Sequence, residues 1–140
     1  MDYSKVFEIS SAGMNVERTR VDVAALNLAN ASTVLAPGGV QYQPARVVSF
    51  AARVDRAGGG DSSLLLPEAS VEATAAAPRM VYEPGHPFAN ERGFVAYPGV
   101  DTASEMVSLM TALRAYEANV AALNTARTLA QKALDIGGAT

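Results

Sequence analysis

The 140-residue chain contains no cysteine and only one histidine, His86. Disulfide bonds, thiol nucleophiles and zinc–thiolate sites are therefore excluded, and no pair of histidines is present to bind a metal. Eleven Lys and Arg face fourteen Asp and Glu, so the formal charge is −3 and there is no basic excess to hold nucleic acid or acidic lipid. The composition predicts no cofactor, no metal site and no nucleic-acid partner.

Long apolar runs are also missing. No run approaches the roughly 18 residues that a membrane span requires, because charged or amide residues recur throughout the chain. The N-terminus carries Asp2 and Glu8 where a secretory signal would need a basic start and an uninterrupted apolar stretch. We expect no direct membrane insertion, and any export must use a route that does not read a cleaved signal peptide.

Proline is confined to the middle of the chain. All seven prolines lie between Pro37 and Pro98, and the two flanking segments contain no helix breaker except Gly13 and the terminal glycines. This punctuation predicts an α+β, mainly α, protein with two long terminal helices that enclose a small, irregular β-containing insert. The boundaries that we expect are 1–34 and 101–138 for a discontinuous helical domain, and 35–100 for the insert.

The C-terminal segment carries an apolar stripe whose steps alternate between three and four residues. Thr102 and Glu105 have the spacing of a capping box, and Gly137 follows the last periodic residues, so we expect a helix from 102 to 136. A helix this long cannot bury its own stripe and needs a partner along its length. The stripe consists of Met106, Leu109, Leu113, Tyr116, Val120, Leu123, Arg127, Ala130 and Leu134. Ala112, Ala126 and Ala133 line one flank and would allow a second helix to approach closely.

The N-terminal segment is the first candidate partner, in an antiparallel coiled coil. Its three-four stripe is weaker and includes two amides, Asn27 and Asn30. An amide on a helix seam must find a hydrogen-bond partner and so sets the register, although both side chains could instead face water. A second apolar series repeats every seven residues on a neighbouring face, so this helix needs two neighbours: Phe7, Met14, Val21 and Leu28. Self-association is the simplest way to bury these faces.

The insert shows short β patterns. Residues 47–55 alternate with period two, and 79–83 and 93–97 are short β-branched and aromatic runs, so a hairpin-like unit of two or three strands is expected. Residues 62–77 are rich in Ala and Ser and are left as a loop or weak strand. Gly58, Gly59 and Gly60 lack the Lys of a phosphate-binding loop and are interpreted as a spacer.

His86 lies in the turn sequence Pro84-Gly85-His86-Pro87. No serine elbow, phosphate loop or carboxylate pair accompanies it, so a structural turn histidine is favoured over a general base and no catalytic residue is assigned. An enzyme ranks as the weakest hypothesis.

Three groups of residues resemble a known family. The N-terminal group is Val23-Ala24-Ala25-Leu26-Asn27-Leu28-Ala29-Asn30-Ala31, which is similar to the Asn-rich motif of the axial (rod and hook) proteins of the bacterial flagellum. The second runs from Val81-Tyr82-Glu83-Pro84-Gly85-His86-Pro87 through Gly93-Phe94-Val95 to Tyr97-Pro98-Gly99-Val100-Asp101, and the third is Arg114-Ala115-Tyr116-Glu117-Ala118-Asn119-Val120 with Leu123-Asn124. These resemble the FlgC-type proximal rod proteins of the basal body.

The resemblance implies a structural, non-enzymatic subunit that polymerises into the proximal rod, transmits torque and lines the axial export channel. It also implies a location in the periplasmic rod, after synthesis in the cytoplasm and export by the flagellar type III apparatus. The implied partners are further copies of the chain, the other rod and basal-body proteins, including the rod adaptor and the distal rod, and the export apparatus.

Fifteen residues on the two terminal segments are expected to form the helix and subunit interface. They are Val16, Val23, Leu26, Asn27, Leu28, Asn30, Met106, Leu109, Leu113, Tyr116, Asn119, Val120, Leu123, Asn124 and Leu134. The rival hypothesis from another class is a soluble helical adaptor or chaperone-like binding module, which would remain a small, defined oligomer and bind client helices.

Overall fold

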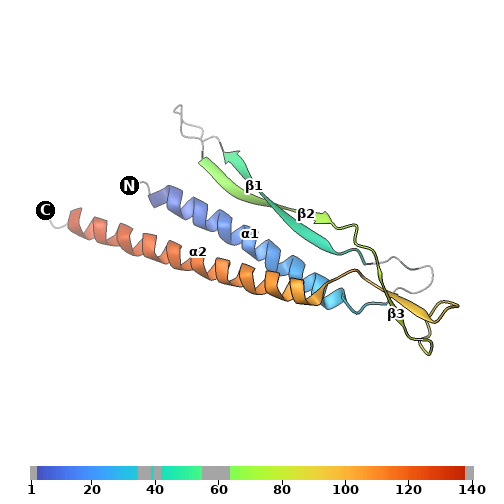
Figure 1. Cartoon of the computed structure of the whole chain (residues 1–140). Helices are drawn as coiled ribbons and strands as arrows, with labels where there is room; N and C mark the ends of the chain where they lie inside the picture. Colours follow the sequence, from blue (N-terminus) through green and yellow to red (C-terminus); the bar gives the residue numbers. More distant parts are fainter. Residues whose placement is uncertain (1–2, 35–38, 40–41, 55–63, 138–140) are drawn as a thin grey trace. The chain divides into compact units, whose positions relative to one another are not determined.

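The computed structural model describes residues 3–34, 39, 42–54 and 64–137 of the chain. Two long helices, α1 (Tyr3–Asn30) and α2 (Thr102–Gly137), enclose four strands: β1 (Ala45–Val54), β2 (Leu64–Ala73), β3 (Arg79–Tyr82) and β4 (Phe94–Tyr97) (Figure 1). This order confirms the mainly helical α+β class with a small β insert. Within the described residues, no helix is both long and apolar enough to cross a membrane.

The chain divides into two compact units, and each unit contains parts of both helices and of the insert. The first unit comprises Met1–Thr19, Val48–Ser70 and Thr111–Thr140. The second unit comprises Arg20–Val47 and Val71–Met110. Each unit is described below by itself.

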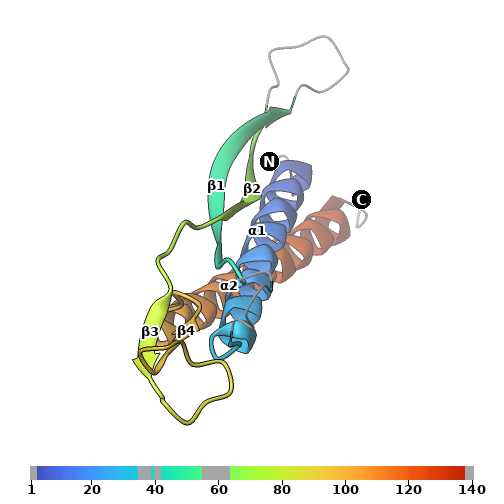
Figure 2. The ribbon, with the colours of Figure 1, turned by 90° about the vertical axis from the view of Figure 1, so that its right-hand side faces the viewer.

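In the first unit, α1 and α2 lie side by side and run in opposite directions (Figures 1 and 2). Gly13 of α1 faces Asn119 of α2 so closely that a Cβ at residue 13 would lie 3.0 Å from the Asn119 side-chain nitrogen. Ala112 and Ala126 lie seven residues before and after Asn119, on the same face of α2, and both are buried. A stripe of small residues on α2 therefore faces α1.

This geometry corrects the expected pairing of α2. Leu113, Tyr116 and Leu134 of the predicted stripe stay exposed, whereas Ala112 and Ala126 of the alanine flank are buried. Leu109, Val120 and Leu123 of the stripe are half-buried, and Ala133 is exposed. The physical reason is the missing side chain at Gly13, because close approach of two helix backbones requires small residues on both. The helices pair as predicted, but through the neighbouring face of α2.

The start of α2 also differs from expectation. Asp101, not Thr102, caps the helix: its carboxylate accepts hydrogen bonds from the backbone N–H groups of Ala103 at 3.1 Å and Ser104 at 3.5 Å. The Asp101 carbonyl accepts the first helical hydrogen bond, from Glu105 N–H at 3.0 Å. The predicted capping box is absent because the Glu105 side chain bonds elsewhere, to Asn27.

The strands form two separate two-stranded sheets, β1–β2 and β3–β4. Strand β2 decides between the two alternatives left open for residues 62–77, a loop or a weak strand, in favour of a strand. Its sequence lacks a clear alternation, so its extended form depends on pairing with β1, which sequence periodicity does not report. Pro44 O accepts a hydrogen bond from Thr74 N–H and closes one end of this ribbon. The spacer Gly58, Gly59 and Gly60 lies outside the described residues.

The β3–β4 hairpin belongs to the second unit and confirms the two short runs predicted there. The strands are antiparallel, with Val81 opposite Val95, and Val95 is fully buried. Gly93 immediately precedes β4 and has φ +79°, a conformation that residues with a Cβ rarely adopt. His86 lies in the connection between the strands, where its Nδ1 accepts a hydrogen bond from Phe88 N–H at 3.1 Å. This hydrogen bond stays within the turn that connects the two strands.

Candidate assembly interface

The side chain of Asn27 is buried and fully hydrogen-bonded within the second unit. It has no exposed surface and makes four hydrogen bonds. Its Nδ2 donates to Ala45 O at 2.8 Å and to Glu105 Oε1 at 3.0 Å. Its Oδ1 accepts from Tyr42 Oη–H at 2.9 Å and from Ala45 N–H at 3.0 Å. We call Asn27, Tyr42, Ala45 and Glu105 the Asn27 cluster.

The Asn27 cluster joins three segments that are far apart in the sequence. Asn27 lies near the end of α1, Ala45 begins β1, and Glu105 lies in the first turn of α2. An amide offers two donors and an acceptor with two lone pairs, and all four are used here. Of the neutral side chains only glutamine carries the same amide, and it is one methylene longer, so asparagine at residue 27 holds the three segments in one arrangement.

The electrostatics of the cluster favour a neutral tyrosine. Burial raises the pKa of Tyr42 above its ordinary value of 10.0, and the charge of the Glu105 carboxylate raises this pKa further. The phenol must also keep its proton in order to donate to Asn27. Ionisation of Tyr42 therefore opposes the folded arrangement of the second unit.

We expect the stability of the protein to fall as pH rises through 10. The pKa of Tyr42 is higher in the folded than in the unfolded chain, so its contribution is fully present below the unfolded value and is lost at alkaline pH. Tyr42→Phe should cost about 1 kcal/mol at pH 7, the value of one hydrogen bond, and should reduce the fall between pH 8 and 10.5. Urea unfolding of the wild type and of Tyr42→Phe at pH 8 and at pH 10.5 measures the fall in stability. An equal fall in the two proteins contradicts the prediction.

The second predicted amide has a different environment. Asn30 is partly exposed, and its Nδ2 donates to Leu26 O of its own helix at 2.8 Å. Its Oδ1 is 3.5 Å from the Thr33 hydroxyl, just beyond the end of α1. Asn27 thus bonds across to α2, whereas the hydrogen bonds of Asn30 stay local to the end of α1.

Helix α2 leaves large apolar side chains exposed in both units. In the second unit these are Met106, Val107 and Met110, each more than half exposed. In the first unit they are Leu113, Tyr116, Leu129, Leu134 and Ile136, the last two about three-quarters exposed. Large apolar side chains exposed in such number on one helix indicate an interaction site. We refer to these eight residues as the α2 apolar surface.

The fifteen expected interface residues divide into three groups by exposure. Val16, Val23 and Asn27 are buried within the chain. Those of intermediate exposure are Leu28, Asn30, Leu109, Asn119, Val120 and Leu123. The exposed ones are Leu26, Met106, Leu113, Tyr116, Asn124 and Leu134. The first group belongs to the protein's own core, and the third is available to other molecules.

Several residues of these surfaces escaped the sequence analysis. Tyr42 gave no signal, because its partner Asn27 is fifteen residues away, and Glu105 was assigned to a capping box. Val107, Met110, Leu129 and Ile136 lie off the predicted three-four stripe. A count of all large apolar residues on α2, without choosing one stripe, would have found them.

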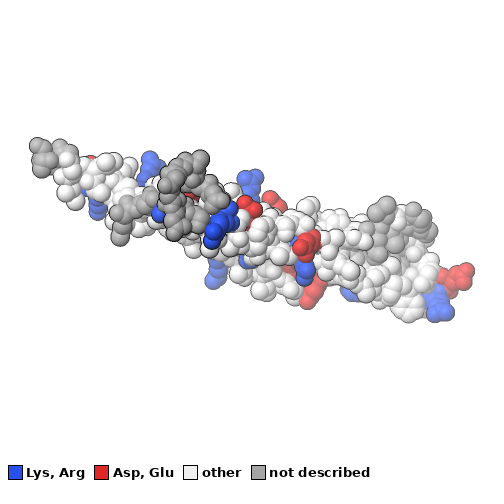
Figure 3. Space-filling view, turned by 90° about the horizontal axis from the view of Figure 1, so that it is seen from above, with Lys and Arg blue, Asp and Glu red and all other residues white. Residues whose placement is uncertain are grey.

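The charged groups of the described residues are dispersed. No cluster of three or more His, Asp or Glu able to hold a metal is present among them. Figure 3 shows, on one face, basic and acidic side chains interspersed on a surface that is mostly uncharged.

Comparison with known proteins identifies relatives along almost the whole chain. Residues 91–136 match the family described as flagellar basal body rod FlgEFG protein C-terminal. The flagellar basal-body rod protein FlgC of Salmonella typhimurium is 39% identical over 132 residues, which cover 94% of this chain and 96% of that protein. FlgC of Bacillus subtilis is 32% identical over 141 residues, with 92% and 94% covered. The chain therefore belongs to the FlgC family of flagellar basal-body rod proteins.

Proposed function

We propose that the chain polymerises into the proximal rod, where it transmits torque and lines the axial export channel. Its family makes it a structural subunit of the basal-body rod. The observation that supports polymerisation is the α2 apolar surface, which a single chain leaves in water. Because burying each Leu, Ile or Met side chain yields about 1.5–3 kcal/mol, packing against neighbouring subunits would strongly favour assembly.

The division of labour within the chain is part of this proposal. Residues 1–34 and 101–138 form the axial core, and residues 35–100 contact neighbouring subunits. The fifteen expected interface residues then serve two purposes. Val16, Val23 and Asn27 stabilise the subunit, and the exposed ones, such as Met106 and Leu134, contact other subunits.

Delivery and partners complete the proposal. The chain is made in the cytoplasm and exported by the flagellar type III apparatus without a cleaved signal peptide. A sequence without cysteine is indifferent to the redox change that accompanies this passage. Its partners in the rod are adjacent proximal rod subunits, the rod adaptor and the distal rod.

Hydrogen exchange provides the test. We expect the α2 amides of residues 111–137 to exchange quickly in the purified monomer and to be protected in isolated basal bodies, because the large apolar side chains exposed on this part of α2 are covered only in the assembly. Full protection of these amides in a stable monomer would contradict coupled assembly and would favour the soluble helical adaptor. Absence of the chain from purified basal bodies would contradict the proposal altogether.

Met110→Glu should separate assembly from folding. Met110 is 57% exposed, so the charge should change the free energy of unfolding by less than about 0.5 kcal/mol. In the rod, the same carboxylate would be buried without a partner, and the number of copies per basal body should fall at least tenfold. Quantitative mass spectrometry of basal bodies measures this number. Ser104→Glu, which adds the same charge to the first turn of α2, should incorporate normally.

A further inference from the structure

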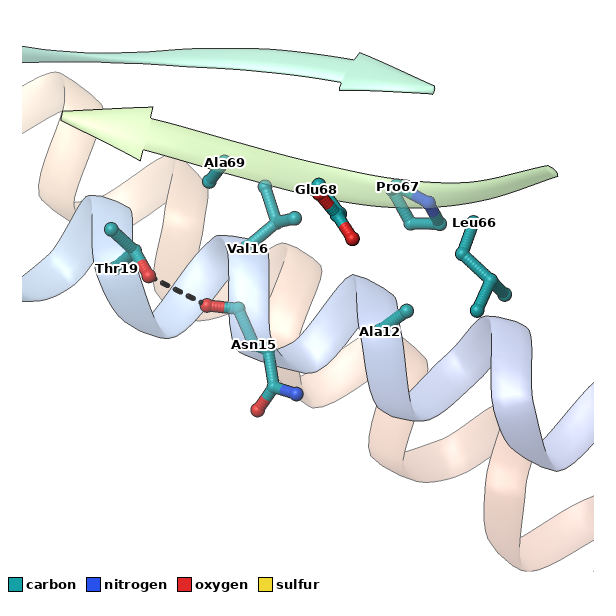
Figure 4. Close-up of a pocket in the computed structure, with 8 residues that line it drawn as sticks. All are labelled: Ala12, Asn15, Val16, Thr19, Leu66, Pro67, Glu68 and Ala69. Carbon is teal, nitrogen blue, oxygen red and sulfur yellow. Dashed lines mark hydrogen bonds between the residues drawn. The ribbon is translucent and has the colours of Figure 1, made fainter. Parts of the chain in front are cut away.

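A cleft opens between α1 and β2 in the first unit. It has a volume of about 280 Å³, and a second hollow continues along α1 toward its N-terminal end. Figure 4 shows the side chains of Ala12 and Val16 pointing from α1 toward the strand, and those of Leu66 and Glu68 pointing from β2 toward the helix. We call this the α1–β2 cleft.

The α1–β2 cleft combines an apolar floor with an acidic rim. Ala12, Val16, Leu66 and Pro67 supply the floor. Glu68 is the charged residue among those that line the cleft. The chemistry that fits is an apolar ridge that also carries a positive charge.

The end of α2 combines apolar side chains with a positive charge, and most of it extends beyond the described residues of α1. Gly13 faces Asn119, so Tyr3, ten residues before Gly13, lies level with Leu129, ten residues after Asn119. Both helices advance 1.5 Å per residue, so residues 130–137 extend past the first described residue of α1 (Figure 1). We call residues 129–137 the α2 end.

One face of the α2 end carries a lysine between two large apolar residues. Leu129, Lys132 and Ile136 are spaced by three and four residues and so lie on one side of the helix. All three are exposed, Ile136 to 77%. This face matches the α1–β2 cleft in polarity and is opposite to it in charge.

We propose that the α2 end of one subunit docks in the α1–β2 cleft of a second copy of this chain. Leu129 and Ile136 contact the apolar floor, and Lys132 meets the carboxylate of Glu68. A continuous helix cannot fold back into the cleft of its own chain, so the contact is between subunits. Because the two surfaces differ, it is a head-to-tail contact that leaves a free cleft and a free α2 end for further copies. This inference rests on the proposed polymerisation and adds which surfaces meet.

A charge exchange tests the electrostatic part of the contact in the full chain. Glu68→Lys and Lys132→Glu should each lower the number of copies per basal body at least fivefold, and the double variant should return to within twofold of the wild type. Both residues are exposed, so circular dichroism should show unchanged folding of all variants. Glu91→Lys, an exposed charge reversal in the second unit, should have no effect. If the fold-loss of copies in the double variant equals the product of the two single fold-losses, the proposal is overturned.

Cysteine cross-linking tests the geometry, and the natural chain contributes no background because it has no cysteine. Leu66→Cys and Ile136→Cys are placed in two copies that carry tags of different size and are produced in the same cells. A disulfide between the two tagged copies in isolated basal bodies is expected. If both variants incorporate normally and no such bond forms, or if Ile136→Cys bonds to another rod protein, the second-copy contact is wrong although the rod function stands. If the wild-type chain is missing from basal bodies, the proposed function itself fails.

Discussion

Replacing Asn27 with leucine is expected to lower the free energy of unfolding by about 3 kcal/mol. Leucine has a similar size but cannot bond to the backbone N–H and C=O of Ala45, and each buried group left without a partner costs about 1–3 kcal/mol. Tyr42 and Glu105 lose their contacts as well but can turn toward water, because both are only partly buried. Urea unfolding followed by far-UV circular dichroism measures the loss.

Asn27→Asp distinguishes the donors of this amide from its acceptors. Aspartate keeps the acceptors for Tyr42 and Ala45 N–H, but it loses both donors and places a carboxylate about 3 Å from Glu105 Oε1. We expect a loss of about 2–3 kcal/mol at pH 7, of which Glu105→Gln should restore about half, because it removes the like charge and supplies a donor. No rescue by Glu105→Gln would contradict the assignment of Glu105 as the partner.

Asn30→Ala is the matched control on the same helix. The side chain of Asn30 is partly exposed, and its donor bonds to Leu26 O of its own turn. Its removal should cost less than about 1 kcal/mol. A loss as large as that of Asn27→Leu would show that the position at the end of α1, and not the Asn27 cluster, sets the stability.

The elements whose ends are set by proline, glycine and other turn residues were predictable from the sequence. Helix α2 was expected over 102–136 and runs Thr102–Gly137, because helix ends depend on local residues such as the terminal glycines. The runs 79–83 and 93–97 became β3 and β4 for the same reason, since β-branched and aromatic residues alternate there with turn residues. Strand β2 was left open between a loop and a weak strand, because its conformation comes from pairing with β1.

The face of a helix that meets a given partner was less predictable. Periodicity showed that α2 carries a stripe of large apolar residues, and the obvious partner was α1. The structure instead turns Ala112 and Ala126 toward α1, leaving Leu113 and Leu134 exposed. A periodic apolar stripe indicates that one face of a helix must be buried, but it does not identify the neighbour that buries it. In this protein the face of α2 that packs on α1 depends on Gly13, which allows the two helices to approach closely.

The Asn27 cluster shows the same limit for polar groups. An amide among apolar residues announced a hydrogen-bonding role, and the resemblance to axial proteins included this residue. Its partners are 15 and 18 residues away and, for Glu105, 78 residues away. Only the folded arrangement brings these groups together, so the role of Asn27 was a hypothesis and its network was beyond sequence reasoning.

Gly93→Val is expected to lower the free energy of unfolding by about 3 kcal/mol. The φ of Gly93 is +79°, which costs a residue with a Cβ about 1–2 kcal/mol and costs more for a β-branched one. An added Cβ would also lie 2.9 Å from the Tyr82 ring and 3.2 Å from Cβ of Pro84. Tyr82 is exposed and can move aside, but the proline ring is rigid.

The strain caused by Gly93→Val also affects the β3–β4 hairpin, whose centre contains the buried Val95. Gly93 N–H donates to Asn90 O, and Gly93 O accepts from Glu83 N–H, both at 2.8 Å, so a changed φ disturbs the turn that begins β4. Gly93→Asn should cost only about half as much, because asparagine tolerates positive φ. Gly85→Ala, with no atom near its added Cβ, should stay within about 0.5 kcal/mol of the wild type. Equal costs for Gly93→Val and Gly93→Asn would show that the contact with Pro84, rather than the backbone conformation, requires glycine at this position.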